Sequence, residues 1–173
     1  MRELIAGVLV SAAAMMSLPA AAEEAEQPSY SEVGAATAPV ADAYFAAYTG
    51  RDWDRLETLI AEDADFRDPT ATLVFGGIVS EGSAAMMERF RNGYSSITHM
   101  SFATSRRMIS GNVAIYEGAL DWGINLGGGT VVDSVTPMVI VLTVKDGKVV
   151  HHRDYVDYAP FLEAIRAARS KAE

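Results

Sequence analysis

Residues 113–157 read VAIYEGALDWGINLGGGTVVDSVTPMVIVLTVKDGKVVHHRDYVD, and this stretch sets the fold class. It holds three long segments rich in Val, Ile, Thr and aromatic residues, a composition typical of β-strands. Gly127–Gly129 and Asp146-Gly147 separate the segments at the points where hairpin turns are needed. The predicted strands cover residues 113–125, 130–145 and 148–157.

One more strand precedes this stretch, over residues 97–109, and Gly111-Asn112 supplies the turn between them. After the last strand, Pro160 opens a short helix that runs from Phe161 to about Ala168. The C-terminal half of the chain is therefore predicted as a four-stranded meander that is closed by a helix.

The residues before the meander carry helical signals. Thr37 with Pro39 predicts the start of a helix. Gly50 ends this helix, and Asp52 caps a second one that contains Trp53. The apolar side of the first helix consists of Val40, Ala43, Tyr44, Ala47 and Tyr48.

A short strand over residues 64–68 follows these helices and ends at Pro69. A third helix begins at Ser80 or Ser83 and runs to about Arg91, with Met86, Met87 and Phe90 on its inner side. Helices followed by an antiparallel meander indicate an α+β fold with helices on one face of the sheet. Because strands of this length coil, we expect a cone-shaped, strongly curved, mostly antiparallel sheet that wraps around the N-terminal helices and encloses one pocket.

The N-terminus has the pattern of a secretory signal peptide. Arg2 is followed by an apolar run over residues 4–18 and by the small residues Ala20 to Ala22. The run is shorter than the roughly 20 apolar residues that cross a bilayer. We therefore expect cleavage after Ala22 and a periplasmic or secreted protein. The expected organisation is a signal peptide (1–22), a flexible leader (23–36) and a single domain (37–173).

Charge and composition exclude several classes of function. The chain has a formal net charge of −9 and no cysteine. An acidic domain repels phosphate backbones and anionic lipid, so neither nucleic acid nor a membrane is an expected partner. Three histidines, two of them adjacent, form no metal-binding signature, and no Gly-rich phosphate loop is present. We therefore expect no metal and no cofactor.

Three segments resemble a known superfamily. These are YFAAYTGRDWDRLETLIAEDADFRDP (44–69), GNVAIYEG (111–118) and KDGKVVHHRDYVDY (145–158). They are similar to the nuclear transport factor 2-like superfamily, which includes ketosteroid isomerase, scytalone dehydratase, limonene epoxide hydrolase and the SnoaL-like polyketide cyclases. The resemblance covers about residues 37–168. It implies the cone-shaped fold, whereas the same fold hosts several chemistries and also non-enzymes.

The resemblance also implies site residues, although no member's full set is present. The catalytic aspartate and the oxyanion-hole tyrosine of ketosteroid isomerase fall on Asp68 and Tyr44, but the second donor of that hole falls near Val139. The two catalytic aspartates of limonene epoxide hydrolase fall on Asp154 and near Asp121.

Two further correspondences are incomplete. The arginine partner in limonene epoxide hydrolase falls near Ala119. One pocket histidine of scytalone dehydratase falls on His99 and the other near Glu117, and its helix tyrosine falls near Tyr48.

Strand alternation gives an independent interpretation of the two main carboxylates. Asp68 shares a face with Phe66 and Ala64, so it is predicted to lie among apolar side chains, where burial would favour a base that works near neutrality. The alternative is that Asp68, beside Pro69, only caps the turn. Asp154 shares a face with His152, and both are expected to look into the cavity. Its alternative role is a salt bridge at the rim of the sheet.

Other candidates depend on faces that parity alone does not assign. Glu117 and Asp121 share one face of the strand from Val113, but both faces of that strand are apolar. These two residues are therefore either site residues or polar residues on an exposed or dimer-facing surface. His99 is a candidate base or proton shuttle. Its alternative, like that of the helix tyrosines, is a structural role. The expected cavity lining includes Phe66, Tyr44, Met86 and either Trp53 or Trp122.

These residues together favour acid–base catalysis without a cofactor, of the lyase, dehydratase or isomerase type, on a small, largely apolar, oxygenated molecule. Asp68 is the expected base, a tyrosine polarises a carbonyl or a leaving hydroxyl, and Asp154 with His152 and His99 completes the relay. The alternatives are an epoxide hydrolase and a non-catalytic binding module for an apolar ligand. Because the strands are apolar on both faces, we also expect a homodimer.

Overall fold

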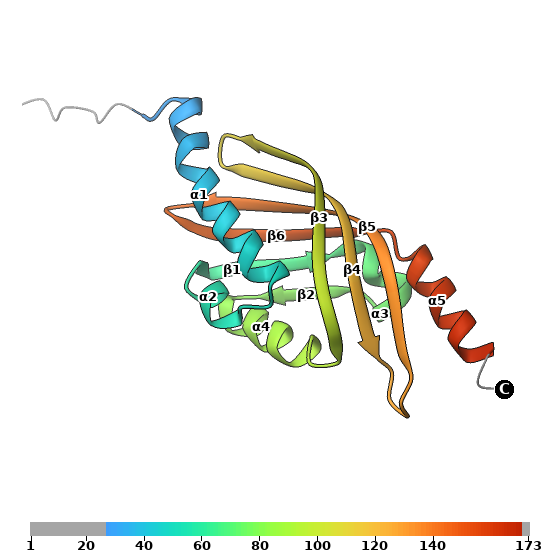
Figure 1. Cartoon of the computed structure of the whole chain (residues 1–173). Coiled ribbons are helices and arrows are strands. Elements are labelled where there is room, and N and C mark those ends of the chain that lie inside the picture. Colours follow the sequence, from blue (N-terminus) through green and yellow to red (C-terminus); the bar gives the residue numbers. More distant parts are fainter. Residues whose placement is uncertain (1–26, 171–173) are drawn as a thin grey trace, which may run out of the picture.

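A computed structural model describes residues 27–170 (Figure 1), so the predicted signal peptide lies outside the described residues. The helices are α1 (Tyr30–Thr49), α2 (Trp53–Glu57), α3 (Thr72–Phe75), α4 (Ser83–Glu88) and α5 (Ala159–Ser170). The strands are β1 (Ile60–Asp68), β2 (Ile78–Glu81), β3 (Ile97–Ser110), β4 (Val113–Asn125), β5 (Val131–Lys145) and β6 (Lys148–Val156). A 3₁₀ turn (Pro69–Ala71) follows β1, and a π-helical turn (Arg89–Gly93) follows α4.

The strands form one curved, open sheet in the order β2-β1-β6-β5-β4-β3. The four strands of the predicted meander are confirmed, and each pairs with the next in antiparallel fashion. The predicted turn residues Gly111, Gly127–Gly129 and Gly147 all have positive φ, which glycine adopts without steric cost. β1 lies parallel to β6, and this pairing is the exception in an otherwise antiparallel sheet. The expected α+β cone is confirmed.

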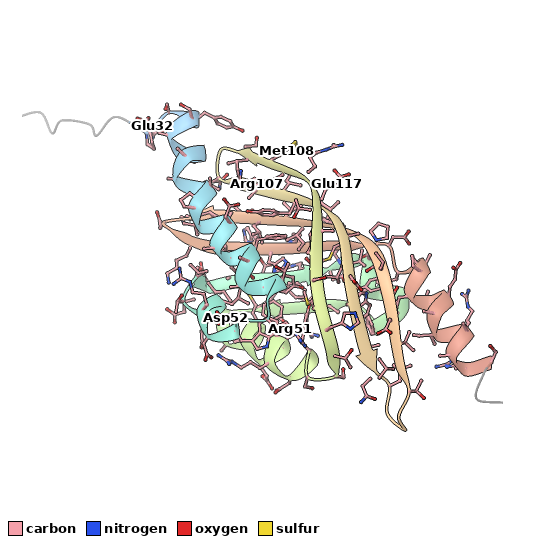
Figure 2. The ribbon with its side chains drawn as sticks, viewed as in Figure 1. Glu32, Arg51, Asp52, Arg107, Met108 and Glu117 are labelled. Carbon is pink, nitrogen blue, oxygen red and sulfur yellow. The ribbon has the colours of Figure 1, made fainter. Side chains whose placement is uncertain are left out.

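Helix α1 crosses the concave face of the sheet and begins earlier than predicted. Ser29 and Glu32 form a capping box at its start (Glu32 in Figure 2), so the predicted start at Thr37 is wrong. Residues 30–36, which we assigned to a flexible leader, belong to the helix. Pro39 lies inside the helix rather than in its first turn.

The segment between β1 and β3 is more structured than predicted. β1 ends before Pro69 as expected, but it begins at Ile60, four residues earlier than the predicted strand, and α3 and β2 were not predicted. The predicted third helix corresponds to α4 and starts at Ser83, the second of the two candidate starts. Its predicted inner residues Met86, Met87 and Phe90 are buried. Asp52 caps α2 as predicted, and its side chain accepts a hydrogen bond from the backbone N–H of Arg55.

The structure resolves which face of β4 is inside. Ala114, Tyr116, Leu120 and Trp122 are buried, and Tyr116 lies next to Phe45 of α1. The opposite face carries Glu117 and Asp121, which therefore point away from the helices. Within residues 27–170 no helix is long and apolar enough to cross a membrane.

Candidate functional site

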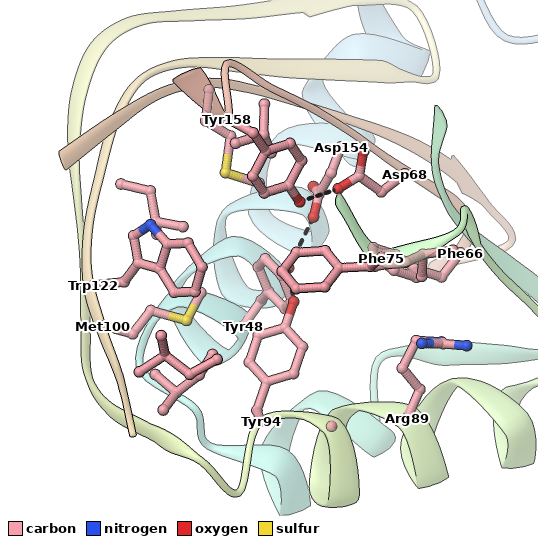
Figure 3. Close-up of a pocket in the computed structure, with 17 residues that line it drawn as sticks. Tyr48, Phe66, Asp68, Phe75, Arg89, Tyr94, Met100, Trp122, Asp154 and Tyr158 are labelled. Atoms are coloured by element: carbon pink, nitrogen blue, oxygen red, sulfur yellow. Dashed lines mark hydrogen bonds between the residues drawn. The ribbon is translucent and has the colours of Figure 1, made fainter. Parts of the chain in front are cut away.

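A cavity of about 220 Å³ lies between the concave face of the sheet and the helices (Figure 3). At roughly 30 Å³ per water molecule, it has room for about seven waters or one small organic molecule. Most of its lining is apolar and includes Phe66, Phe75, Met100, Trp122 and Met138. The polar lining side chains are Tyr48, Asp68, Arg89, Tyr94, Asp154 and Tyr158.

The cavity brings Asp68 and Asp154 together, as strand alternation predicted. β1 pairs with β6 in the parallel register Asp65↔His151 to Arg67↔Arg153. The next residues in that register are Asp68 and Asp154, and neighbouring strands lie about 4.8 Å apart. Both side chains are almost fully buried and line the same cavity. Their catalytic roles stay predictions.

Asp68 is both a turn cap and a cavity residue. Its Oδ1 accepts hydrogen bonds from the backbone N–H groups of Thr70 and Ala71, each at 2.9 Å, and from the Thr70 hydroxyl at 2.6 Å. Its Oδ2 accepts a hydrogen bond from the Tyr158 hydroxyl at 2.5 Å. A carboxylate accepts about four hydrogen bonds, so the acceptor capacity of Asp68 is nearly used. The turn-cap alternative is therefore correct for one of its two oxygen atoms.

Asp154 uses fewer of its hydrogen-bond acceptor sites than Asp68 does. Its Oδ1 lies 2.8 Å from His152 Nε2, and its Oδ2 accepts a hydrogen bond from the Tyr48 hydroxyl at 2.9 Å. Each oxygen thus makes one protein contact and retains a lone pair for a ligand. The alternative role, a salt bridge at the rim, does not fit the structure, because Asp154 is buried and Arg153 pairs with Asp65 on the other face.

Behind Asp154 runs a buried chain of hydrogen bonds. His152 is fully buried, and its Nδ1 lies 2.9 Å from the Tyr44 hydroxyl. Tyr94 lies 2.5 Å from the Tyr48 hydroxyl. In one arrangement every hydrogen finds an acceptor: Tyr44 donates to Nδ1, Nε2–H donates to Asp154, and Tyr94 donates to Tyr48, which donates to Asp154. If the Nε2 proton were on Asp154 instead, His152 would carry its hydrogen on Nδ1 and donate it to Tyr44. The hydroxyl hydrogen of Tyr44 would then have no acceptor in this network. We therefore assign the Nε2–H tautomer to His152.

The environment keeps the tyrosine hydroxyls protonated. Burial raises the pKa values of Tyr44 and Tyr48 well above the ordinary value, and the charge of Asp154 raises them further. Burial and the contact with Asp68 raise the pKa of Tyr158 in the same way. A phenol that holds its proton this firmly is a hydrogen-bond donor rather than an acid. Among the lining groups, the carboxylates are thus the groups suited to proton exchange.

Several predicted site residues lie elsewhere. His99 is exposed on β3, and its side chain contacts Asp121 at 3.3 Å on the face of the sheet that is turned away from the cavity. Glu117 lies on that same face and pairs with Arg106 (Glu117 in Figure 2). The prediction that His99 faces the pocket is therefore wrong, and Asp121 and Glu117 are not cavity residues. Parity could not exclude them because β4 is apolar on both faces.

The other predicted lining residues divide into two groups. Phe66 and Trp122 line the cavity as expected. Trp53, Met86 and Tyr44 belong to the layer behind it: Met86 and Tyr44 are fully buried, and Trp53 stacks on Phe90 with ring centroids 5.7 Å apart. Met86 and Tyr44 are therefore not among the lining residues, and of the alternatives Trp53 and Trp122 it is Trp122 that lines the cavity.

Sequence reasoning missed Tyr94, Tyr158, Arg89 and Phe75. Arg89 begins the π-helical turn that follows α4, and Tyr94 comes directly after this turn, a feature frequent at functional sites. Tyr158 lies in the link between β6 and α5, and the half-exposed Phe75 contacts its ring edge-on. The only sequence signal was that Tyr158 directly follows the predicted cavity strand.

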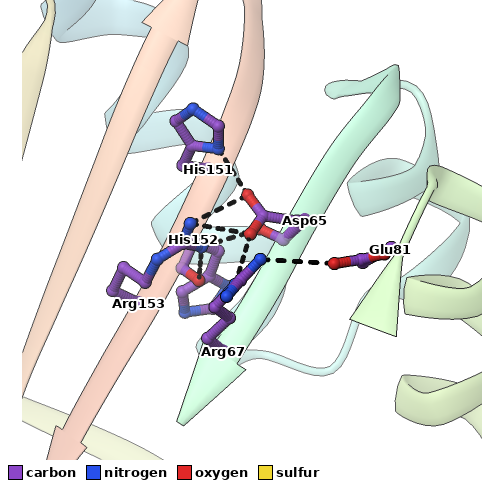
Figure 4. A network of polar contacts seen from close by, with 6 residues as sticks. All are labelled: Asp65, Arg67, Glu81, His151, His152 and Arg153. Carbon is purple, nitrogen blue, oxygen red and sulfur yellow. Dashed lines mark hydrogen bonds and ion pairs between the residues drawn. The ribbon is translucent and has the colours of Figure 1, made fainter. Parts of the chain in front are cut away.

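A second polar cluster lies on the outer face of β1 and β6 (Figure 4). Asp65 accepts hydrogen bonds from Arg153 at 2.7 and 2.9 Å and from Arg67 at 2.8 Å, and it also contacts His151. Burial alone would raise the pKa of Asp65, but the hydrogen bonds from His151, Arg153 and Arg67 lower it to about 2. The cluster therefore ties the parallel strand pair together. Within residues 27–170 no three His, Asp or Glu side chains are placed to hold a metal ion.

Comparisons with known proteins agree with this architecture. The profile of the SnoaL-like domain family matches residues 41–152, so the chain belongs to that family. This family lies within the nuclear transport factor 2-like superfamily that the sequence resembles. No curated protein matches the chain.

Solved structures share the fold at low identity. A protein described as a SnoaL-like polyketide cyclase, from Shewanella denitrificans, has a TM-score of 0.68 and 17% identity, covering 76% of this chain and 97% of that one. A ketosteroid isomerase-like protein from Catenulispora acidiphila, in complex with trimethylamine, has a TM-score of 0.61 and 20% identity over 74% and 92%. An LEH-like epoxide hydrolase from M. tuberculosis has a TM-score of 0.59 and 16% identity over 79% and 93%. These neighbours share the fold of this chain.

Proposed function

We propose that this protein is a cofactor-independent enzyme that moves a proton on a small, largely apolar, oxygenated molecule, in a reaction of the lyase or isomerase type. The observation that carries the proposal is the carboxylate pair of Asp68 and Asp154, buried on neighbouring strands against an apolar cavity. Such a pair is costly to bury without a role, because burial disfavours each charge and each charge disfavours the other.

Asp154 is the better candidate for the general base, in place of Asp68. Asp68 uses nearly all of its acceptor capacity, whereas Asp154 has an unused lone pair on each oxygen. His152 and Tyr48 hold Asp154 in place from behind. A positioned base of this kind contributes about 10²–10⁴-fold to a rate.

In the proposed step, Asp154 takes a proton from a substrate carbon or hydroxyl, and the electron pair of the broken bond moves into the substrate. The surrounding tyrosines hold their protons too firmly to replace the lost one. The proton therefore returns from Asp154 itself, either to another substrate atom in an isomerisation or to a leaving hydroxyl in an elimination. Epoxide hydrolysis by Asp154 with Asp121 is not favoured, because Asp121 lies on the far face of the sheet.

The test begins with native mass spectrometry of the purified protein, which identifies any molecule that stays bound. That molecule is then incubated with the protein, and chromatography with mass spectrometry follows the appearance of an isomer of equal mass or the loss of water. We expect Asp154→Asn to slow this reaction at least about 10²-fold while the molecule still binds. Asp133→Asn, on the exposed face, is the matched control. Normal turnover by Asp154→Asn would contradict the assignment of the base, and binding without any reaction in wild type would favour the binding module.

We also propose that the protein is exported and acts as a homodimer. The predicted cleavage site after Ala22 supports export to the periplasm or beyond. The convex face of the sheet supports the dimer, because it leaves Val131, Val135 and Tyr155 about half exposed. An intact mass that retains Met1 in protein from the native host would contradict the export.

A further inference from the structure

The direction of the hydrogen bonds around the cavity restricts the kind of ligand that fits it. Tyr48 has one hydroxyl hydrogen and gives it to Asp154. Tyr94 lies 2.5 Å from the Tyr48 oxygen, so Tyr94 is the donor of that pair. Tyr158 gives its hydrogen to Asp68. All three phenols that line the cavity therefore point their hydrogens into the protein.

Two N–H groups of the lining side chains also donate within the protein. Trp122 Nε1 donates to the Thr136 hydroxyl at 3.1 Å. Arg89 Nε donates to the Ser80 hydroxyl at 2.7 Å. The Nη1 and Nη2 groups of Arg89 make no hydrogen bond to the described residues, but in the view of Figure 3 the rings of Phe66 and Phe75 lie between the guanidinium and the two carboxylates.

What these side chains offer to a ligand near the carboxylates is therefore a set of acceptors. Asp154 has two unused lone pairs, and Asp68 Oδ2 has one. The Tyr94 and Tyr158 oxygens donate one hydrogen bond each and accept none from the described residues. A ketone or ether oxygen placed there would face only lone pairs and would lose its hydrogen bonds to water. A donor would pair with these acceptors.

We infer that the ligand of this cavity is a small, largely apolar molecule whose polar group, a hydroxyl or an ammonium, donates a hydrogen bond to Asp154 and Asp68. This inference rests on the proposed small-molecule site but does not require that the site be catalytic. It reverses the polarity of the oxyanion hole that the sequence resemblance implies, in which a tyrosine donates to a substrate carbonyl. Here Tyr44 lies outside the cavity lining, and the hydrogen of Tyr48 is already taken.

The test compares probes that share one ring system and differ in their polar group. The probes are 2-naphthol, 2-naphthylmethylammonium, 2-methoxynaphthalene and 2-naphthaldehyde, and their Kd values for the protein are measured by calorimetry or fluorescence titration. At least one donor probe should bind about tenfold or more tightly than the ether and the aldehyde, because the latter two leave buried acceptors unpaired. Whichever donor binds more tightly identifies the group as a neutral hydroxyl or as a cation.

Equal or tighter binding of the ether or the aldehyde would overturn the inference, whatever the result of the turnover test. Two variants provide an internal check. Asp154→Asn replaces a carboxylate, which only accepts, with an amide that also donates. The ratio of the Kd of the aldehyde to the Kd of the donor probe should therefore fall by at least about threefold. Tyr158→Phe removes a phenol acceptor but frees a lone pair on Asp68 Oδ2, so the preference for the donor probe should not fall. If Asp154→Asn leaves the preference unchanged, or Tyr158→Phe abolishes it, the polarity does not come from the two carboxylates and the inference is wrong.

Discussion

Replacing Asp65 with asparagine should remove most of the acid sensitivity that the outer-face cluster gives to the fold. The substitution keeps the shape of the side chain and removes its charge. In the native protein, His151, Arg153 and Arg67 all face this carboxylate, and Glu81 is the other acid of the cluster. Their hydrogen bonds favour the ionised form of Asp65 in the folded state alone, so its ionisation is linked to folding.

The magnitude follows from the lowered pKa. Folding moves the pKa of Asp65 from an ordinary value of 3.8 to about 2. At about 1.36 kcal/mol per pH unit, this difference corresponds to roughly 2 kcal/mol. The side chain is only 12% exposed, so solvent screening reduces the figure little. The stabilisation is complete above about pH 5, where both states are ionised, and is lost as the pH falls towards 2, because the unfolded chain binds the proton first.

Urea unfolding of wild type and Asp65→Asn, measured from pH 7 down to pH 2.5, tests this directly. The variant should be less stable by roughly 2 kcal/mol at pH 7, or by about 4–8 °C in Tm, and the difference should shrink below pH 4. Asp63→Asn, an exposed carboxylate on the same strand, is the control and should behave like wild type. A difference between Asp65→Asn and wild type that stays constant over the whole pH range would refute the reasoning.

Two further predictions concern packing. Gly118→Ala should lower the free energy of unfolding in urea by about 1–3 kcal/mol, because its Cβ would lie 2.1 Å from the Ala103 carbonyl oxygen. Gly93→Ala, whose nearest contact would be 3.9 Å, is the control and should not destabilise the fold. Equal stability of the two variants would contradict this. Val135→Lys on the convex face should convert the expected dimer to a monomer in sedimentation at micromolar concentration. Val79→Lys, at a similarly exposed position on β2, is the control and should leave the dimer intact. A wild type that is already monomeric would contradict the proposed interface.

The meander was predictable because its signals are local. Long apolar strands alternate with glycine turns, and each strand pairs with its neighbour in sequence. The parallel pairing of β1 with β6 is not local: Asp65 and His151 are 86 residues apart, and no turn links the strands. Likewise α3 and β2 are too short to show a period. The early start of α1 has a local signal in the Ser29–Glu32 capping box, although Thr37 with Pro39 predicts a later start.

The candidate site was likewise predictable only where its signals are local to one strand. Alternation within one strand placed Asp68 beside Phe66 and Asp154 beside His152 on inner faces, and this is where the structure has them. Alternation could not choose between two apolar faces of β4, so it left open whether Asp121 and Glu117 are site residues, and the structure places both on the convex face. It also could not tell a residue that lines the cavity from one that lies directly behind it, as His152 does. That distinction depends on the volumes of neighbouring rings from other elements.

The two polar clusters of this protein are opposite sides of one strand register. The same alignment that puts Asp65 beside His151 on the convex face puts Asp68 beside Asp154 on the concave face, because side chains alternate along each strand. A slip of one residue would turn every side chain of β1 to the other face. It would carry Asp65 away from its cations and Asp68 out of the cavity at the same moment. The outer cluster therefore stabilises the register on which the inner carboxylate pair depends, although none of its members except Asp65 is close to full burial. A chain that needs two acids side by side in an apolar cavity gains from holding their strands together on the face where water and cations are available.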